Sequence, residues 1–92
     1  MYKIVFTNRM KKDAKLMRKR GKNMDKLVKT LSLLAEGGPM PAQYRDHPLT
    51  GNLHDFRECH IEPDWLLVYQ IYDDTLILSA TATGSHADLF GC

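Results

Sequence analysis

The chain has 92 residues, of which 43% are hydrophobic and 26% are charged, and its formal net charge is +2. So short a chain buries enough surface for one modest core only, so we expect a single domain over residues 1–92. No apolar run approaches the roughly 18 residues of a membrane helix, and residues 1–7 lack the pattern of a secretory signal. These features predict a cytoplasmic protein that does not contact membranes.

The N-terminal part of the chain predicts one strand and two helices. Residues 2–6 combine β-branched and aromatic residues in an alternating pattern that is typical of a strand. Apolar residues then recur at helical spacing over residues 9–20, and Gly21 ends this basic amphipathic helix. Asn23 is a favourable N-cap for a second helix over residues 24–36. Their short connection predicts a helical hairpin packed on a sheet.

The C-terminal part predicts three strands after a long connection. Residues 37–52 are rich in proline and glycine, and a connection of this length often carries function. Strand-like runs follow over residues 53–61, 65–72 and 75–83, with Pro63-Asp64 and Asp73-Asp74 as turn signals between them. Such short turns predict an antiparallel meander. We therefore expect an α+β fold of order β-α-α-β-β-β, with an antiparallel sheet of about four strands.

The charges are distributed unevenly along the chain. Residues 9–29 hold ten of the 13 basic residues and two acids, whereas residues 30–92 hold two basic residues and nine acids. A dense positive face attracts polyanions, which favours nucleic acid as the partner. The alternative is a solvated helix face without a specific partner.

Four histidines lie in the second half of the chain: His47, His54, His60 and His86. Imidazole both accepts and donates protons near neutral pH. RNA cleavage needs both transfers, because a base deprotonates the ribose 2′-hydroxyl while an acid protonates the leaving 5′-oxygen. A metal is not required where a cationic side chain stabilises the phosphorane. The histidines therefore predict metal-independent RNA cleavage, provided that they converge in the fold.

Other uses of these histidines compete with catalysis. A histidine near a strand end is commonly a surface or hydrogen-bonded residue. A zinc site could use His47, His60, His86 and Cys59, but the chain has no CxxC or HxxxH pair. Cys59 and His60 are also adjacent, so in a strand they point to opposite faces. We therefore expect no metal and no cofactor, and reduced, unpaired Cys59 and Cys92.

Three stretches carry a more specific signal than the histidines alone. They are RDHPLTG at residues 45–51, HIEPDW at residues 60–65 and TGSHADLF at residues 83–90. In this combination they closely resemble the YafQ branch of the RelE toxin superfamily. The resemblance extends over essentially the whole chain.

The resemblance implies a RelE-like fold and a bacterial toxin of a toxin–antitoxin pair. Toxins of this kind are endoribonucleases that enter the ribosomal A site and cleave the mRNA being translated. The implied partners are the ribosome, mRNA and a cognate antitoxin protein, and operator DNA is reached only through the antitoxin. Two alternatives share this fold and surface: a non-catalytic module that binds RNA or the ribosome, and a co-repressor that acts together with its antitoxin.

The resemblance also implies roles for individual residues. The acid–base set is His47, His60, Asp64 and His86, with His86 as one proton-transfer partner and with Asp64 and His60 close to the 2′-hydroxyl. Which histidine is the base stays open. Trp65 and Phe90 are expected to shape the mRNA pocket or to stack on a base. The expected RNA-binding cations are Arg45, Arg57, Lys11, Lys15, Arg18 and Lys19.

The chain departs from the family pattern at Ala82, where these toxins commonly carry an arginine that holds the scissile phosphate. Loss of such a cation is expected to lower the cleavage rate by a factor on the order of 10²–10³. One explanation is natural variation in which Arg45 or Arg57 supplies the charge. The other is an inactivated form of the toxin.

Overall fold

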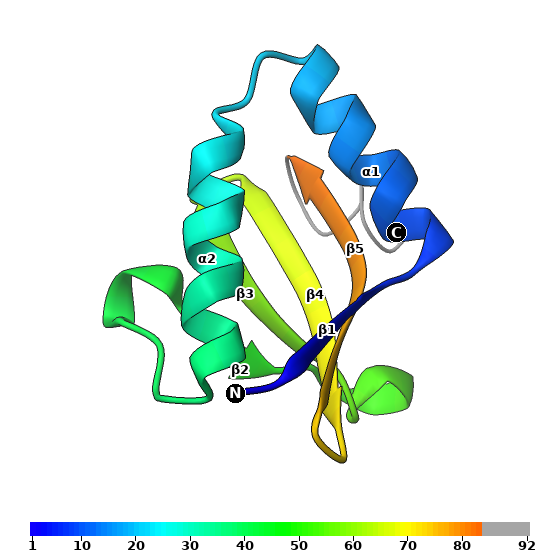
Figure 1. Ribbon diagram of the computed structural model, residues 1–92, viewed down its shortest axis with the longest axis vertical. Helices are drawn as coiled ribbons and strands as arrows, with labels where there is room; N and C mark the ends of the chain where they lie inside the picture. The colour runs from blue at the N-terminus through cyan, green and yellow to red at the C-terminus, as the bar shows by residue number, and fades with distance from the viewer. Residues whose placement is uncertain (84–92) are drawn as a thin grey trace.

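The computed structural model describes the backbone of residues 1–83, together with their side chains except at residue 53 and residues 79–83. This part of the chain forms a five-stranded sheet with two α-helices and two short 3₁₀ helices (Figure 1). In chain order the elements are β1 (Lys3–Phe6), α1 (Asn8–Lys19), α2 (Met24–Glu36), η1 (Ala42–Tyr44), β2 (His47–Pro48), η2 (Gly51–Leu53), β3 (Arg57–Glu62), β4 (Trp65–Tyr72) and β5 (Thr75–Thr83). The strand order in the sheet is β1-β5-β4-β3-β2.

Local hydrogen bonds set the ends of both helices. Thr7 precedes α1, and its Oγ1 accepts a hydrogen bond of 3.1 Å from the backbone N–H of Met10. Asn23 caps α2 in a similar way by accepting from the N–H of Asp25. Helix α2 ends at Gly37, whose φ of 81° lies in the left-handed region that glycine adopts without steric cost. The two predicted helices are confirmed.

The sheet is mixed rather than wholly antiparallel. β3, β4 and β5 form the predicted meander. β1, however, pairs with β5 in parallel, with Ile4 opposite Leu76. The prediction of an antiparallel sheet was wrong at this position, because β1 connects to the other strands through two helices, which impose no antiparallel geometry as a tight turn does.

The long connection between α2 and the meander holds a further strand. β2 has only two residues, and His47 and Pro48 pair with Glu58 and Arg57 of β3. The run predicted to start at residue 53 becomes a strand only at Arg57, because η2 occupies Gly51–Leu53. The sheet therefore has one short edge strand more than the sequence predicted.

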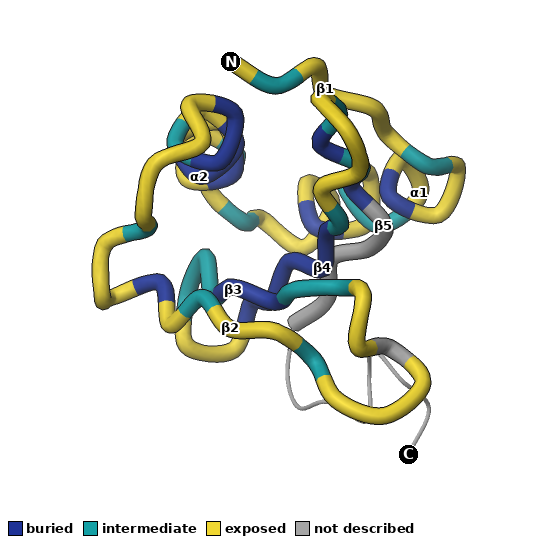
Figure 2. The backbone as a smooth tube through the Cα atoms, turned by 90° about the horizontal axis from the view of Figure 1, so that it is seen from below, coloured by how far each residue is buried: buried dark blue, intermediate teal, exposed yellow. Residues whose placement is uncertain are grey.

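Both helices lie on the same face of the sheet (Figure 2). They diverge from the short connection between them at the top of Figure 1. α1 packs against β5 and α2 packs against β3. The buried residues of this core are Met10, Met17, Leu27, Leu31, Leu34, Tyr44, Cys59, Trp65, Leu67, Tyr69, Leu76 and Leu78. Met10 and Met17 place the apolar face of α1 in this core, and Met24 of α2 packs against the core in a partly buried position. In the described part of the chain, neither helix is long and apolar enough to cross a membrane.

The opposite side of the sheet, called the helix-free face below, has a smaller apolar cluster. Leu66 and Val68 are buried there and pack with Leu49 and Phe56. β4 is therefore covered on both sides, as its almost continuous apolar sequence indicates.

Candidate active site

Two of the predicted catalytic histidines meet at one carboxylate. His47 of β2 lies opposite Glu58 of β3, and its Nε2 is 3.2 Å from Oε1 of Glu58. His60 follows Glu58 by two residues in β3, so the side chains of His60 and Glu58 project from the same face of the sheet. Nε2 of His60 is 3.7 Å from the same carboxylate oxygen. Pairing of β2 with β3 therefore assembles the cluster.

The cluster lies on the helix-free face. Glu58 is the register partner of Val68 and His60 is the partner of Leu66, and opposite residues of an antiparallel pair share a face. The Glu58 side chain is 0% exposed, whereas the side chains of His60 and His47 are 16% and 46% exposed. The carboxylate is therefore buried, while both imidazole rings remain accessible to a substrate.

Sequence reasoning missed Glu58. The signal that could have found it is the alternation of a strand, which places Glu58 and His60 on one face. A buried carboxylate is costly unless it is paired or hydrogen-bonded, and the two imidazoles are positioned to do this. Glu58 is thus the carboxylate that contacts His47 and His60, whereas the sequence pointed to Asp64.

Each imidazole also contacts a backbone carbonyl. Nδ1 of His47 is 3.1 Å from the carbonyl oxygen of Pro48, and Nδ1 of His60 is 3.2 Å from that of Pro63. A neutral imidazole carries its proton on one nitrogen only, so it can donate either to the backbone carbonyl or to Glu58. Carboxylate and carbonyl together fix the orientation of each ring, as proton transfer requires.

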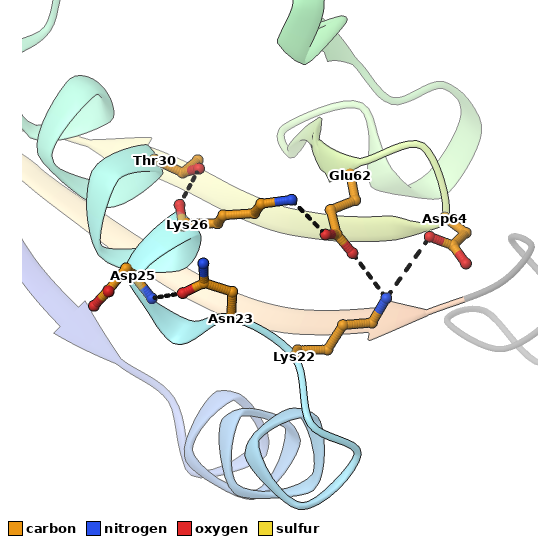
Figure 3. Close-up of polar contacts among 7 residues, drawn as sticks. All are labelled: Lys22, Asn23, Asp25, Lys26, Thr30, Glu62 and Asp64. Atoms are coloured by element: carbon orange, nitrogen blue, oxygen red, sulfur yellow. Dashed lines mark hydrogen bonds and ion pairs between the residues drawn. The ribbon is translucent and has the colours of Figure 1, made fainter.

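Asp64, another predicted member of the acid–base set, does not belong to the cluster around Glu58. It lies between β3 and β4 and its side chain is 66% exposed. Its ion pair among the described residues is with Lys22, whose Nζ is 3.9 Å from Oδ1 of Asp64 (Figure 3). The structure therefore brings His47 and His60 together and leaves Asp64 at the end of the strand.

Glu62 faces the helices instead of the histidines. Its carboxylate accepts hydrogen bonds of 2.8 Å from Lys22 and 2.7 Å from Lys26 (Figure 3). These hydrogen bonds lower the pKa of Glu62, and the bond to Glu62 raises the pKa of Lys22. The register shifts between His60 and Glu62, and such a bulge interrupts the alternation that would otherwise place both on one face. The carboxylate of Glu58 therefore lies on the helix-free face of the sheet, and that of Glu62 lies on the helix side.

A hydrogen-bonded group supports the segment that carries His47. Nε of Arg57 donates a hydrogen bond of 2.8 Å to Oδ1 of Asp46, and the hydroxyl of Tyr69 donates to Oδ2 of the same carboxylate. Burial opposes the charge of Arg57, but the hydrogen bonds to Asp46 and Tyr69 raise its pKa overall. The charge of Arg57 is therefore already balanced by Asp46, which weakens the explanation in which Arg57 replaces an arginine at position 82.

Two residues near the site are part of the core. Trp65 is 0% exposed and its ring packs among core residues at the start of an apolar strand, so it offers no exposed ring face for stacking on a base in this structure. Cys59 is also 0% exposed, and burial raises the pKa of its thiol to about 12. The thiol packs in the core on the helix side of the sheet, on the opposite face from His47 and His60.

The remaining predicted residues lie apart from the histidine cluster. The cations of α1 are exposed, but α1 covers β5 on the helix side of the sheet. These cations are Lys11, Lys15, Arg18 and Lys19. His86 and Phe90 lie outside the described residues. The backbone register places Ala82 opposite Leu66, which is itself opposite His60, so position 82 belongs to the same cross-strand row as His60.

His47, Glu58 and His60 could hold a metal ion. Their donor atoms all lie within 4.8 Å of one another. Imidazole nitrogen and carboxylate oxygen are typical ligands of zinc and other transition metals. The sequence-based expectation of a metal-free site therefore stays a prediction, which chelation can test.

Comparison with known proteins gives consistent matches over almost the whole chain. Residues 2–91 match the family model described as the bacterial toxin of type II toxin–antitoxin systems, YafQ. The mRNA interferase toxin YafQ of Escherichia coli K12 is 44% identical over 89 residues, which covers 96% of this chain and 95% of that protein. YafQ in the E. coli DinJ–YafQ complex superposes with a TM-score of 0.89 at 41% identity, and covers 99% of this chain and 100% of that chain. A metal-bound toxin from Helicobacter pylori superposes with a TM-score of 0.89 at 42% identity, and covers 98% and 100% of the two chains.

Proposed function

Because the chain belongs to the YafQ family of toxins of bacterial type II toxin–antitoxin systems, we propose that it is an mRNA endoribonuclease whose histidines carry out the proton transfers. The observation that carries this proposal is the contact of His47 and His60 with one buried carboxylate, that of Glu58. Two oriented imidazoles on an accessible face are what a concerted base and acid require.

The proposed reaction needs no group beyond the RNA and the side chains. A base takes the proton of a ribose 2′-hydroxyl, and the 2′-oxygen forms a bond to the adjacent phosphorus. The bond from phosphorus to the 5′-oxygen of the next nucleotide breaks, and an acid donates a proton to that oxygen. The products are a 2′,3′-cyclic phosphate and a free 5′-hydroxyl. The proposed acid–base set is His47, His60, Asp64 and His86, and Glu58 is a positioning residue for the first two.

We further propose that cleavage takes place on the ribosome and that an antitoxin protein inhibits it. The E. coli relative has been crystallised in a DinJ–YafQ complex, which supports an antitoxin as the partner of this chain. Ribosome dependence predicts a difference between two substrates of identical sequence: mRNA on translating ribosomes is cut, and the same mRNA free in solution is cut far more slowly.

The proposal is tested by cleavage assays on ribosome-bound mRNA with the wild type, His47→Ala and His60→Ala. Each substitution removes a proton-transfer group, so we expect cleavage to fall by roughly 10²–10⁴-fold. His54→Ala is the matched control, because the side chain of His54 is 72% exposed and contacts Asp55 instead of Glu58. A loss of the same size in His54→Ala would contradict the assigned roles.

The same assay separates the proposal from its alternatives. A bell-shaped pH–rate profile that is lost in His60→Ala supports acid–base catalysis. Ribosome binding without cleavage at any pH supports the non-catalytic module, and operator binding only with antitoxin present supports the co-repressor. Cleavage that persists with a strong chelator supports the metal-free reaction, and cleavage that stops and returns on adding zinc assigns the cluster to a metal.

A further inference from the structure

A cleft lies beside the histidine cluster, at the outer edge of β3. It has a volume of about 420 Å³, and its walls come from α2, from the segment around η1 and from the end of β3. Its lining includes Lys26, Lys29, Arg45, His60, Glu62 and Pro63. A volume of this size lies within the range of small-molecule binding sites and leaves room for a nucleotide.

The position of the cleft follows from the shortness of β2. β2 pairs only with Arg57 and Glu58, so the rest of β3 has no strand on its outer side in the described part of the chain. The bulge between His60 and Glu62 interrupts the regular strand at this edge. The edge is therefore open next to His60, which belongs both to the Glu58 cluster and to the wall of the cleft.

The cleft carries a positive charge that is not neutralised. Lys26 is bound to Glu62 at 2.7 Å (Figure 3). Lys29 and Arg45 are exposed, and neither forms an ion pair with any residue that the structure describes. Two cations around one cleft favour an anionic ligand over a neutral or cationic one.

The backbone at Arg45 supports a role for its side chain. Arg45 has a φ of 47° and a ψ of 42°, in the left-handed region that is rarely occupied by residues other than glycine, asparagine and aspartate. The Cβ of an arginine makes such a backbone conformation sterically unfavourable, and strained backbone is often found at functional sites. The strain fits a cation that is needed at the mouth of the cleft.

We propose that this cleft binds the phosphate of an RNA nucleotide that neighbours the nucleotide being cleaved, with Lys29 and Arg45 as its ligands. This rests on the proposed function, since RNA is taken as the substrate. The RNA strand runs from the helix-free face, where Glu58 orients His47 and His60, over the open edge of β3. The phosphate next along the strand then enters the cleft past His60.

The experiment measures binding of a 2′-O-methyl RNA oligonucleotide, which lacks the nucleophile and cannot be cleaved, to the double variant Lys29→Ala, Arg45→Gly. Glycine accepts the left-handed backbone and alanine is a strong helix former, so we expect the variant to fold. Each exposed cation–phosphate contact contributes up to roughly fivefold in affinity, so the double variant should bind on the order of tenfold more weakly. The slope of log K against log salt should fall by about 0.7 per lost contact.

The matched control is the double variant Lys3→Ala, Lys12→Ala. It also removes two positive charges, but from exposed positions on β1 and α1. This control should bind the oligonucleotide like the wild type, apart from a small general effect of charge. Equal weakening in both double variants would overturn the proposal, because it would assign the effect to overall charge.

Two further outcomes separate this inference from the proposed function. If the wild type cuts mRNA but the cleft variant binds and cuts like the control, the cleft proposal fails alone. If the wild type cuts no RNA, the proposed function fails, and the binding assay still reports on the cleft. Weaker binding of the antitoxin with unchanged RNA binding would overturn the proposal and assign the cleft to an acidic protein segment.

Discussion

One oxygen atom of Glu58 faces both histidines, so the charge of this residue can orient two rings at once. We expect Glu58→Gln to lower kcat by about 10–100-fold, the size of effect seen when a group that orients functional histidines is removed. KM should change little, because Glu58 is buried and does not touch substrate. A pH–rate profile should shift in Glu58→Gln, and Glu58→Asp should restore part of the activity. Glu36→Gln, at the exposed end of α2, serves as the control.

Position 82 offers a second prediction at the scale of one residue. It shares a cross-strand row with Leu66 and His60, and two strand spacings amount to roughly 10 Å. An arginine there would bring a cation toward the histidine cluster. We expect Ala82→Arg to raise the rate of mRNA cleavage by a factor on the order of 10²–10³, and to arrest growth when expressed without antitoxin. Ala82→Gln has similar length without the charge and should have no effect. Unchanged cleavage in Ala82→Arg would support natural variation without loss of function.

At the scale of elements, the segment that carries His47 depends on support from β3 and β4. β2 contributes only two residue pairs, and the neighbouring Asp46 is held by Arg57 and Tyr69. We expect Tyr69→Phe to lower the free energy of unfolding by about 1–3 kcal/mol, because a buried charged acceptor loses its donor. In a domain of this size that corresponds to a fall in Tm of roughly 4–8 °C per kcal/mol. Cleavage should fall as well, because His47 loses its fixed position.

The control for this prediction is Tyr72→Phe on the same strand, where the side chain is 69% exposed. Thermal unfolding and cleavage assays on both variants measure the two effects. If Tyr72→Phe lost as much activity as Tyr69→Phe, the effect could not be assigned to the support of Asp46.

The elements that the sequence predicts well are those with local signals. Thr7 and Asn23 mark the helix starts, and the two-residue turns fix the antiparallel pairing of β3, β4 and β5. Parallel pairing of β1 with β5 and the pairing of β2 with β3 depend on contacts between distant segments, which leave no local pattern. The bulge before Glu62 had no signal either, so alternation alone could not separate Glu58 from Glu62. The histidine motif was found through family resemblance, whereas its buried carboxylate required the strand register.

At the scale of the whole molecule, the charge count of the sequence describes the surface only in part. Residues 9–29 carry most of the basic residues, but Lys22 and Lys26 from this stretch are bound to Glu62 of the sheet. The cations of α1 lie over β5, on the other face from His47 and His60. The exposed cations of α1 therefore do not mark the proposed RNA path, whereas Lys29 of the same basic stretch lines the cleft through which we place it.

The contacts of Glu62 also predict how stability depends on pH, because they join the helices to the sheet. The pKa of Glu62 is lowered from an ordinary value of 4.5, so its contribution is present above that pH and is lost as pH falls through the lowered value. The pKa of Lys22 is raised from 10.5, so its contribution is present below that pH and is lost as pH rises through the raised value. Thermal unfolding of wild type and Glu62→Gln should differ by a few degrees at neutral pH, since the pairs are partly exposed. The difference should shrink in acid, and Glu36→Gln should show no such trend.

The parallel pairing of β1 with β5 has a consequence for the order of folding during synthesis. β1 leaves the ribosome among the first segments, yet among the described residues it pairs only with β5, the last of the described elements to be made. At about 5–20 residues per second, β1 waits several seconds before the sheet can close. Contacts between segments so distant in the chain also slow folding after release. A newly made chain therefore spends time with an unpaired, partly apolar strand, which is exposed to association with other chains during that interval.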